Sequence, residues 1–185
     1  RATILPMCNE PVATIVNTNA GELAFQEYFV HRRWQPVLKA YRFHGIEKAR
    51  VTPEIQNALE NAHAIIFCPS NPFVSIEPIL SVKGMSELLQ KARVPKIAVS
   101  PIVGGEALKG PAAKMFQELG MEASAYQVAK LLRGAIDRFV LDRVDEEQAR
   151  SIKDLGMRVW VTDTIMRDET GRERLAREIC EWVNR

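Results

Sequence analysis

Residues 53–68 read PEIQNALENAHAIIFC, and this stretch decides the fold class. Thr52 is a favourable helix N-cap and Pro53 a favourable first-turn residue, so a helix is predicted over 53–62. Residues 64–68, which follow, are apolar throughout and of strand length. A strand without polar alternation is typically covered on both faces, so this run indicates a parallel sheet between layers of helices.

The same alternation continues to the end of the chain. Further strands are predicted at 96–100, 135–141 and 158–162, and further helices at 84–93, 111–120, 125–133, 145–155 and 171–184. Repeated strand–helix–strand order at this spacing predicts parallel strands joined by right-handed crossovers. We therefore expect an α/β fold, a Rossmann-like, doubly wound, mainly parallel sheet, and assign residues 51–185 to a nucleotide-binding domain.

The first fifty residues have a different character. Strands are predicted at 2–5, 12–18 and 41–45, and from about Glu22, where the chain is expected to bend into a short helix. Turn-forming residues separate these runs, and none of the runs is followed by a long helical pattern. Residues 1–50 are therefore predicted to form a β-rich subdomain or insertion.

Composition narrows the function classes. Of 185 residues, 46% are hydrophobic and 26% charged, which is the mix of a globular rather than a disordered chain. A net charge of +2 gives no argument for a nucleic-acid partner. Three widely spaced cysteines argue against a disulfide framework and fit a reducing compartment. Since no apolar run approaches the roughly 20 residues that span a bilayer, we expect a cytoplasmic protein without a membrane partner.

Ligands of open parallel sheets bind beyond the carboxyl ends of the strands, and polar residues follow the first predicted strand at that place. Ser70 and Asn71, between two prolines, could offer a hydroxyl and an amide to a ligand, and Ser75 follows. The alternative is a plain turn, because Asn-Pro dipeptides mark turns in any case.

The second strand end carries paired glycines. Ser100 ends the predicted strand, and Gly104 and Gly105 could let the backbone approach a phosphate closely. Lys109 and Lys114 could add positive charge, and the helix predicted next would direct its N-terminal amides at the same place. A glycine-rich connector with two surface lysines is the alternative.

The third strand end reads TDT. Asp163 and Thr164 could hold a metal, a ribose or a base edge. The alternative is that Asp163 caps the following turn, as aspartate commonly does.

Taken together, these strand ends resemble a known family. The motifs, in chain order, are ILPM (4–7), GELAFQEYFV (21–30), PSNPFVSIEPIL (69–80), VSPIVGGEALKGPAAKM (99–115) and VTDTIMRD (161–168). This set resembles the 2-phospho-L-lactate transferase family, which includes a bacterial form that uses phosphoenolpyruvate. The resemblance covers nearly the whole chain.

The resemblance implies an activity and a set of ligands. The family transfers a phospholactyl or phosphoenolpyruvyl group from a GDP-activated donor to the deazaflavin Fo, releasing GMP and forming a precursor of coenzyme F-420, with Mg²⁺ assisting. Ser70, Asn71 and Ser75 would then lie at the donor nucleotide, and residues 100–105 would hold its phosphates. We also expect a homodimer, because a sheet without its N-terminal strands leaves apolar surface to cover.

The chain also departs from the family pattern. The family's N-terminal glycine-rich loop, metal-binding aspartates and deazaflavin contacts are expected upstream of residue 1, so the catalytic residues and metal ligands are expected outside this chain, which alone would be inactive. Glu77 stands where the family often has glycine, and its carboxylate would repel a diphosphate if it faced the site. The alternative functions are a non-catalytic, nucleotide-sugar-binding regulator of the same fold and a plain interaction domain.

Overall fold

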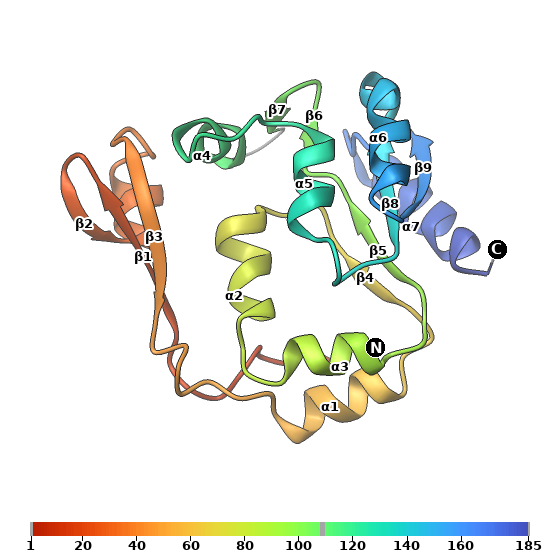
Figure 1. Ribbon diagram of the computed structural model, residues 1–185, viewed down its shortest axis with the longest axis horizontal. Coiled ribbons are helices and arrows are strands. Elements are labelled where there is room, and N and C mark those ends of the chain that lie inside the picture. The colour runs from red at the N-terminus through yellow and green to blue at the C-terminus, as the bar shows by residue number, and fades with distance from the viewer. Residues whose placement is uncertain (1, 108–109, 185) are drawn as a thin grey trace.

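A parallel sheet of four strands forms the centre of the chain, whose computed structural model describes residues 2–107 and 110–184 (Figure 1). In their order across the sheet, the strands are β4 (Ile65–Phe67), β5 (Lys96–Val99), β8 (Arg138–Asp142) and β9 (Arg158–Thr162). Every neighbouring pair is parallel. The predicted α/β fold and its four strands are confirmed.

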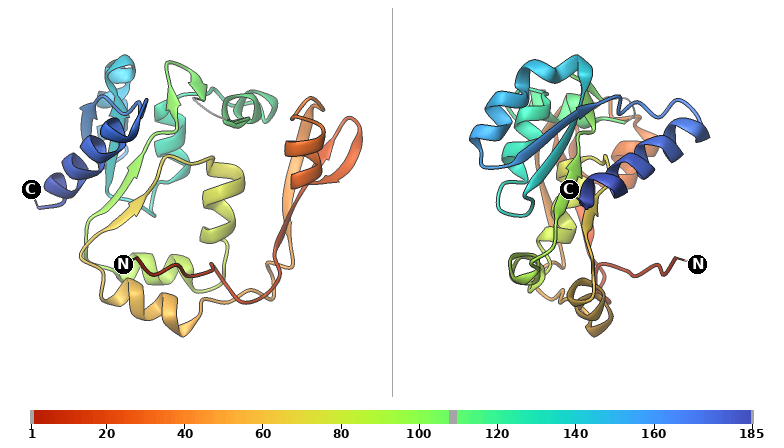
Figure 2. Two further views of the ribbon diagram at one scale, coloured as in Figure 1. Left: turned by 180° about the vertical axis from the view of Figure 1, so that it is seen from behind. Right: turned by 90° about the vertical axis from the view of Figure 1, so that its right-hand side faces the viewer.

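Helices cover both faces of this sheet. Ile97 of β5 belongs to the same hydrophobic cluster as Leu175, while the next residue, Ala98, belongs to the cluster that contains Val128 and Ile152 on the opposite face. The helices of these two layers are α7 (Glu169–Val183) on one face and α5 (Ala125–Leu131) and α6 (Ala149–Asp154) on the other (Figure 2). Successive side chains of a strand point to opposite faces, so each face must be apolar, which explains the unbroken apolar runs.

Helices α1 (Pro53–Glu60) and α3 (Met85–Lys91) share a smaller hydrophobic cluster beside β4. The Thr52 hydroxyl accepts the Ile55 N–H at 3.3 Å, so α1 begins at the predicted cap. Ile55 and Met85 are buried in this cluster. Both helices lie within the predicted ranges.

Shorter elements connect the strands, and several of them differ from expectation. They are η2 (Pro72–Ile76), α2 (Glu77–Leu80), β6 (Ile102–Val103), β7 (Glu106–Ala107), α4 (Ala112–Glu118) and η3 (Arg143–Gln148). Pro72 and Pro78 lie in the first turns of η2 and α2, where a missing N–H costs nothing, so residues that indicated a loop begin helices instead. The helix predicted at 145–155 is divided, because a 3₁₀ segment precedes α6.

Residues 13–44 form an antiparallel sheet of their own. Its strands, in the order β2-β1-β3, are β1 (Ala13–Thr18), β2 (Gly21–Ala24) and β3 (Leu38–His44). In the turn between β1 and β2, the Thr18 hydroxyl donates to the Gly21 carbonyl at 2.8 Å and accepts the Ala20 N–H at 3.1 Å. The chain then bends into η1 (Glu27–His31), as predicted for the segment after Glu22.

Aromatic contacts join the antiparallel sheet to the rest of the chain. The Tyr41 ring meets Phe73 edge-on at 5.8 Å between centroids, and Phe73 meets Phe116 of α4 at 4.7 Å. The Tyr41 hydroxyl donates to the Glu77 carboxylate. Burial raises the pKa of Tyr41, and the bond to Glu77 raises it further, so the phenol keeps its proton and remains a donor. The predicted domain boundary at residue 50 stays a prediction.

The strand predicted at residues 2–5 is wrong. This segment has no regular structure, its described residues are exposed, and Ile4 is 93% exposed. A β-rich composition forms a strand only where a partner strand satisfies its backbone, and no such partner lies beside this segment in the ranges described.

Replacing Tyr41 with phenylalanine should destabilise the fold. The substitution keeps the ring contacts but leaves the partly buried Glu77 carboxylate without its donor, which costs about 1–3 kcal/mol of unfolding free energy. Urea unfolding measures the loss. Tyr126→Phe is the control, because its hydroxyl has no hydrogen-bond partner among the described residues; equal losses in the two variants would contradict the role given to the Tyr41–Glu77 bond.

Candidate functional site

A cleft with both polar and apolar walls lies at the carboxyl edge of the parallel sheet. Its volume is about 230 Å³. Its walls come from segments that follow β4, β5 and β9 and from the starts of α4 and α7. The lining residues are Pro69, Ser70, Asn71, Ser100, Pro101, Ala112, Thr164, Met166 and Arg172. The structure thus brings four of the predicted site residues, Ser70, Asn71, Ser100 and Thr164, to one place.

Asn71 shapes the wall of the cleft. Its side-chain oxygen accepts the N–H groups of Phe73 at 2.9 Å and Val74 at 3.4 Å, and so caps η2. Its amide donates to the Met115 sulfur of α4 at 3.3 Å. The side chain therefore joins two walls through contacts within the chain, as the turn alternative expects.

Ser100 is also held by its own backbone. The buried hydroxyl donates to the Ile102 carbonyl at 2.7 Å and accepts the Ile102 N–H at 3.2 Å. This turn directs the chain from β5 into β6. The hydroxyl thus fixes the loop, with its donor already used.

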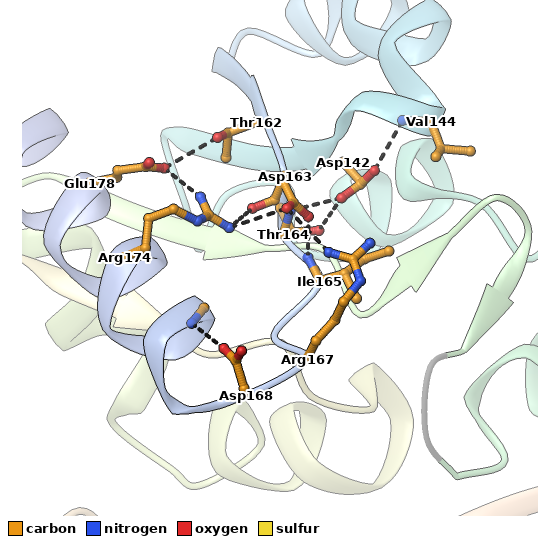
Figure 3. A network of polar contacts seen from close by, with 11 residues as sticks. Asp142, Val144, Thr162, Asp163, Thr164, Ile165, Arg167, Asp168, Arg174 and Glu178 are labelled. Carbon is orange, nitrogen blue, oxygen red and sulfur yellow. Dashed lines mark hydrogen bonds and ion pairs between the residues drawn. The ribbon is translucent and has the colours of Figure 1, made fainter.

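Thr164 is fixed by a buried carboxylate that sequence reasoning missed. Asp142, the last residue of β8, accepts the Thr164 N–H at 2.7 Å and the Thr164 hydroxyl at 3.1 Å through one oxygen (Figure 3). Its other oxygen accepts the Val144 N–H at 3.1 Å. Asp142 is an acidic residue at the carboxyl end of a strand. Polar residues at the ends of the other strands are site candidates on the same ground, so this position could have been found in the sequence.

Asp163 caps the turn after β9, as its alternative interpretation expects. It accepts the Ile165 N–H at 3.1 Å and lies near the guanidinium groups of Arg167 and Arg174, at 3.4 and 3.6 Å. The backbone hydrogen bond from Ile165, with the two arginines, lowers the pKa of this carboxyl. Arg174 also pairs with Glu178, so Figure 3 shows one network that binds α7 to the loop.

The paired glycines lie outside the cleft lining. Gly104 and Gly105 form the turn of the β6–β7 hairpin with positive φ values of 60° and 80°. The Gly104 N–H donates to both oxygens of the buried Asp145 at 3.1 Å. A carboxylate of the chain therefore occupies the amide that was expected to hold a phosphate.

Burial disfavours the ionised form of the Asp145 carboxyl. Desolvation raises the pKa of this carboxyl, the charges of Asp142 and Glu147 act in the same direction, and the Gly104 N–H opposes them. Gln148 adds a further donor at 3.1 Å. The group is therefore a buried acid on which the β6–β7 turn depends.

The remaining predicted residues are dispersed. Lys114 donates to Glu118 at 2.5 Å and to the Pro36 carbonyl at 3.0 Å, so it holds the antiparallel sheet to α4. Lys109 lies outside the described residues. Ser75 lines an apolar groove of about 430 Å³ between β4 and helices α1, α2 and α3, which shares Ser70 with the cleft. The Glu77 carboxylate accepts a hydrogen bond from Tyr41 and does not line the cleft. It would therefore not repel a diphosphate bound there.

Two properties of the described chain bear on its ligands. Across residues 2–107 and 110–184, no three acidic, histidine or cysteine side chains gather into a set that could hold a metal ion. Within the same ranges, no helix combines the length and the apolar character that crossing a membrane requires.

Comparison with known proteins agrees with this arrangement. The model of the family described as 2-phospho-L-lactate transferase CofD matches residues 1–180. The chain belongs to this family. Its motifs 69–80, 99–115 and 161–168 supply the strand-end segments of the cleft, so the features that carry the family resemblance are also those that build the site.

Curated relatives of this CofD-family chain are longer than it is. A protein of Methanosarcina mazei named 2-phospho-L-lactate transferase is 36% identical over 183 residues, 99% of this chain and 58% of the relative. A protein of Methanopyrus kandleri with the same name is 35% identical, over 97% of this chain and 57% of the relative. The chain thus spans less than two thirds of the length of these relatives.

A solved structure shares the fold of the CofD-family chain. It is a crystal structure of a UPF0052-family protein from Bacillus halodurans, which superimposes with a TM-score of 0.61 over 95% of this chain and 62% of its own, at 13% identity. At that identity the likeness supports the fold alone.

The stability contributed at Asp145 should depend on pH. A raised pKa means that the folded chain binds a proton at Asp145 more tightly than the unfolded chain does. The stability of the wild type relative to Asp145→Asn is therefore highest at low pH and falls as the pH rises through the folded-state pKa, by at most about 1.4 kcal/mol per pH unit. Urea unfolding between about pH 4 and pH 7 measures the difference.

The exposed Asp154 on α6 supplies the control for this measurement. The pH dependence measured for Asp145→Asn should be steeper than the one measured for Asp154→Asn, because Asp145 is buried and Asp154 is exposed. A wild type that gains stability relative to Asp145→Asn as the pH rises would contradict the expectation.

Proposed function

We propose that this chain contributes the donor-nucleotide site of a 2-phospho-L-lactate transferase. In this proposal the complete protein moves a phospholactyl or phosphoenolpyruvyl group from a GDP-activated donor to the deazaflavin Fo in coenzyme F-420 biosynthesis. The observation that carries the proposal is membership of the CofD family over residues 1–180, with the family's motifs meeting in one cleft.

The proposed chemistry fits a cleft whose loops are held by hydrogen bonds within the chain. The acceptor hydroxyl attacks the phosphorus that carries the three-carbon acid and loses its proton to water. The bond from that phosphorus to the GMP oxygen breaks, and GMP leaves with the electron pair. Such transfer depends on positioning and charge neutralisation more than on covalent chemistry of the protein. Asn71, Ser100 and Thr164 contribute positioning, because their internal hydrogen bonds fix the three loops around the cleft.

Four parts of the proposal lie outside the described cleft: the metal, the catalytic base, the homodimer and the cytoplasmic location. The described side chains offer no cluster that could hold Mg²⁺ by itself. The proposal assigns the catalytic base to no residue of this chain. The homodimer and the cytoplasmic location also stay predictions, and light scattering checks the dimer.

The decisive test is a calorimetric titration of the chain with GDP in the presence of magnesium, with a UDP-sugar as the competing ligand. Saturable binding of GDP in preference to the UDP-sugar is the expected result. Preference for the UDP-sugar would favour the nucleotide-sugar-binding regulator instead. Binding of neither ligand would contradict a donor site formed by this chain.

Ser70 should contact the ligand directly, and Ser75 should not. Ser70 lies where the cleft and the apolar groove meet and lines both, and its hydroxyl has no hydrogen-bond partner among the described residues, whereas Ser75 lines the groove and not the cleft. Ser70→Ala should weaken GDP binding by roughly tenfold, since a hydrogen bond to a charged group contributes about 1.5–3 kcal/mol. Ser75→Ala is the matched control and should bind like the wild type; equal affinities in the two variants would remove Ser70 from the site.

A further inference from the structure

Among the residues that the structure describes, one charged side chain lines the cleft. It belongs to Arg172, in the first turns of α7, and none of the other described lining residues is basic or acidic. Pro69, Pro101 and Met166 form much of the remaining wall. Apolar walls lower the local dielectric and strengthen the attraction between a cation and an anion.

The other arginines near Arg172 are paired. Arg167 lies 3.4 Å from Asp163, Arg174 lies 2.9 Å from Glu178, and Arg177 lies 2.6 Å from Glu173. For Arg172, by contrast, the described part of the chain supplies no ion pair and no side-chain hydrogen bond. The Arg172 guanidinium is therefore available to a ligand in the cleft, whereas the other three arginines of this segment are paired.

Two of the other groups expected to bind an anion are used within the chain, and Lys109 lies outside the described residues. The Gly104 N–H holds the Asp145 carboxylate, and Lys114 holds Glu118 and the Pro36 carbonyl. Asn71, Ser100 and Thr164 likewise use their polar side-chain atoms in hydrogen bonds within the chain. Of the acidic residues close to Arg172 in sequence, Glu173 pairs with Arg177 at 2.6 Å and Asp168 caps α7 by accepting the Gly171 N–H at 2.7 Å. Glu169 does not line the cleft.

We propose that Arg172 is the anion-binding residue of this cleft and contacts the diphosphate of the donor nucleotide. The proposal rests on the donor-site function given above. A guanidinium presents parallel N–H donors that match two phosphate oxygens, and it keeps its charge at every physiological pH. The Ser70 hydroxyl, on the wall that follows β4, supplies a neutral donor to the same anion.

The test compares three variants with three probes. Calorimetry of the wild-type chain, Arg172→Gln, Arg172→Lys and Arg167→Gln is carried out with GDP, inorganic diphosphate and uncharged guanosine. Arg172→Gln should weaken binding of GDP and diphosphate by about tenfold or more, the scale of a lost charge-assisted hydrogen bond, and leave guanosine affinity unchanged. Arg172→Lys should recover part of the loss, because it restores the charge without the fork.

Arg167→Gln is the matched control, an exposed arginine of the same segment that is paired with Asp163 and does not line the cleft. It should bind all three probes within about twofold of the wild type, because the anion subsite is untouched. Urea midpoints of Arg172→Gln and the wild type should coincide, since no internal contact of the side chain is lost.

The outcomes separate this inference from the proposed function. GDP binding that is equal in the wild type and Arg172→Gln overturns the role of Arg172 and leaves the donor site standing. Arg172-dependent binding of diphosphate without binding of GDP supports the anion subsite and contradicts the nucleotide site. A wild-type chain that binds neither GDP nor diphosphate contradicts both.

Discussion

The buried carboxylate of Asp142 is the interaction on which the carboxyl edge of the sheet depends. A buried charge is tolerated only where donors surround it, and this one receives three, from the backbone of Val144 and from the backbone and hydroxyl of Thr164. These bonds fix the start of η3 and the loop after β9 with respect to β8. The position of α7, and so of Arg172 at its first turns, follows from that loop.

The cleft separates side chains that build it from side chains that a ligand can contact. Asn71 caps η2 and reaches Met115, and Ser100 closes the turn into β6, so both are committed to the fold. Ser70 and Arg172 carry no such bonds among the described residues. A preformed cleft of this kind limits the conformational entropy lost on binding, because most of its polar walls are ordered beforehand.

Local signals in the sequence predicted most of the fold. The helix cap at Thr52 and the apolar runs at 64–68 and 96–100 are local features, which depend only on residues close in sequence. They therefore predicted the positions of α1, β4 and β5 correctly. The segment 2–5 had strand composition but no partner, and the helical residues 72–80 were concealed by prolines that are tolerated in first turns.

The site was less predictable because its contacts join distant parts of the chain. The amide of Gly104 is taken by Asp145, and Lys114 is drawn toward the antiparallel sheet, neither of which a strand-end motif reveals. Whether an arginine is paired depends on which acids the fold brings near it, so Arg172 became apparent only in three dimensions.

Several polar residues of the cleft wall also stabilise the fold, and this affects how the site can change in evolution. A substitution at Asn71 or Thr164 alters stability together with recognition, so selection for a folded protein opposes it. A substitution at Ser70 or Arg172 changes the surface offered to a ligand while the scaffold keeps its bonds. Such a site can acquire a new ligand preference through few genetic steps, with the architecture inherited intact.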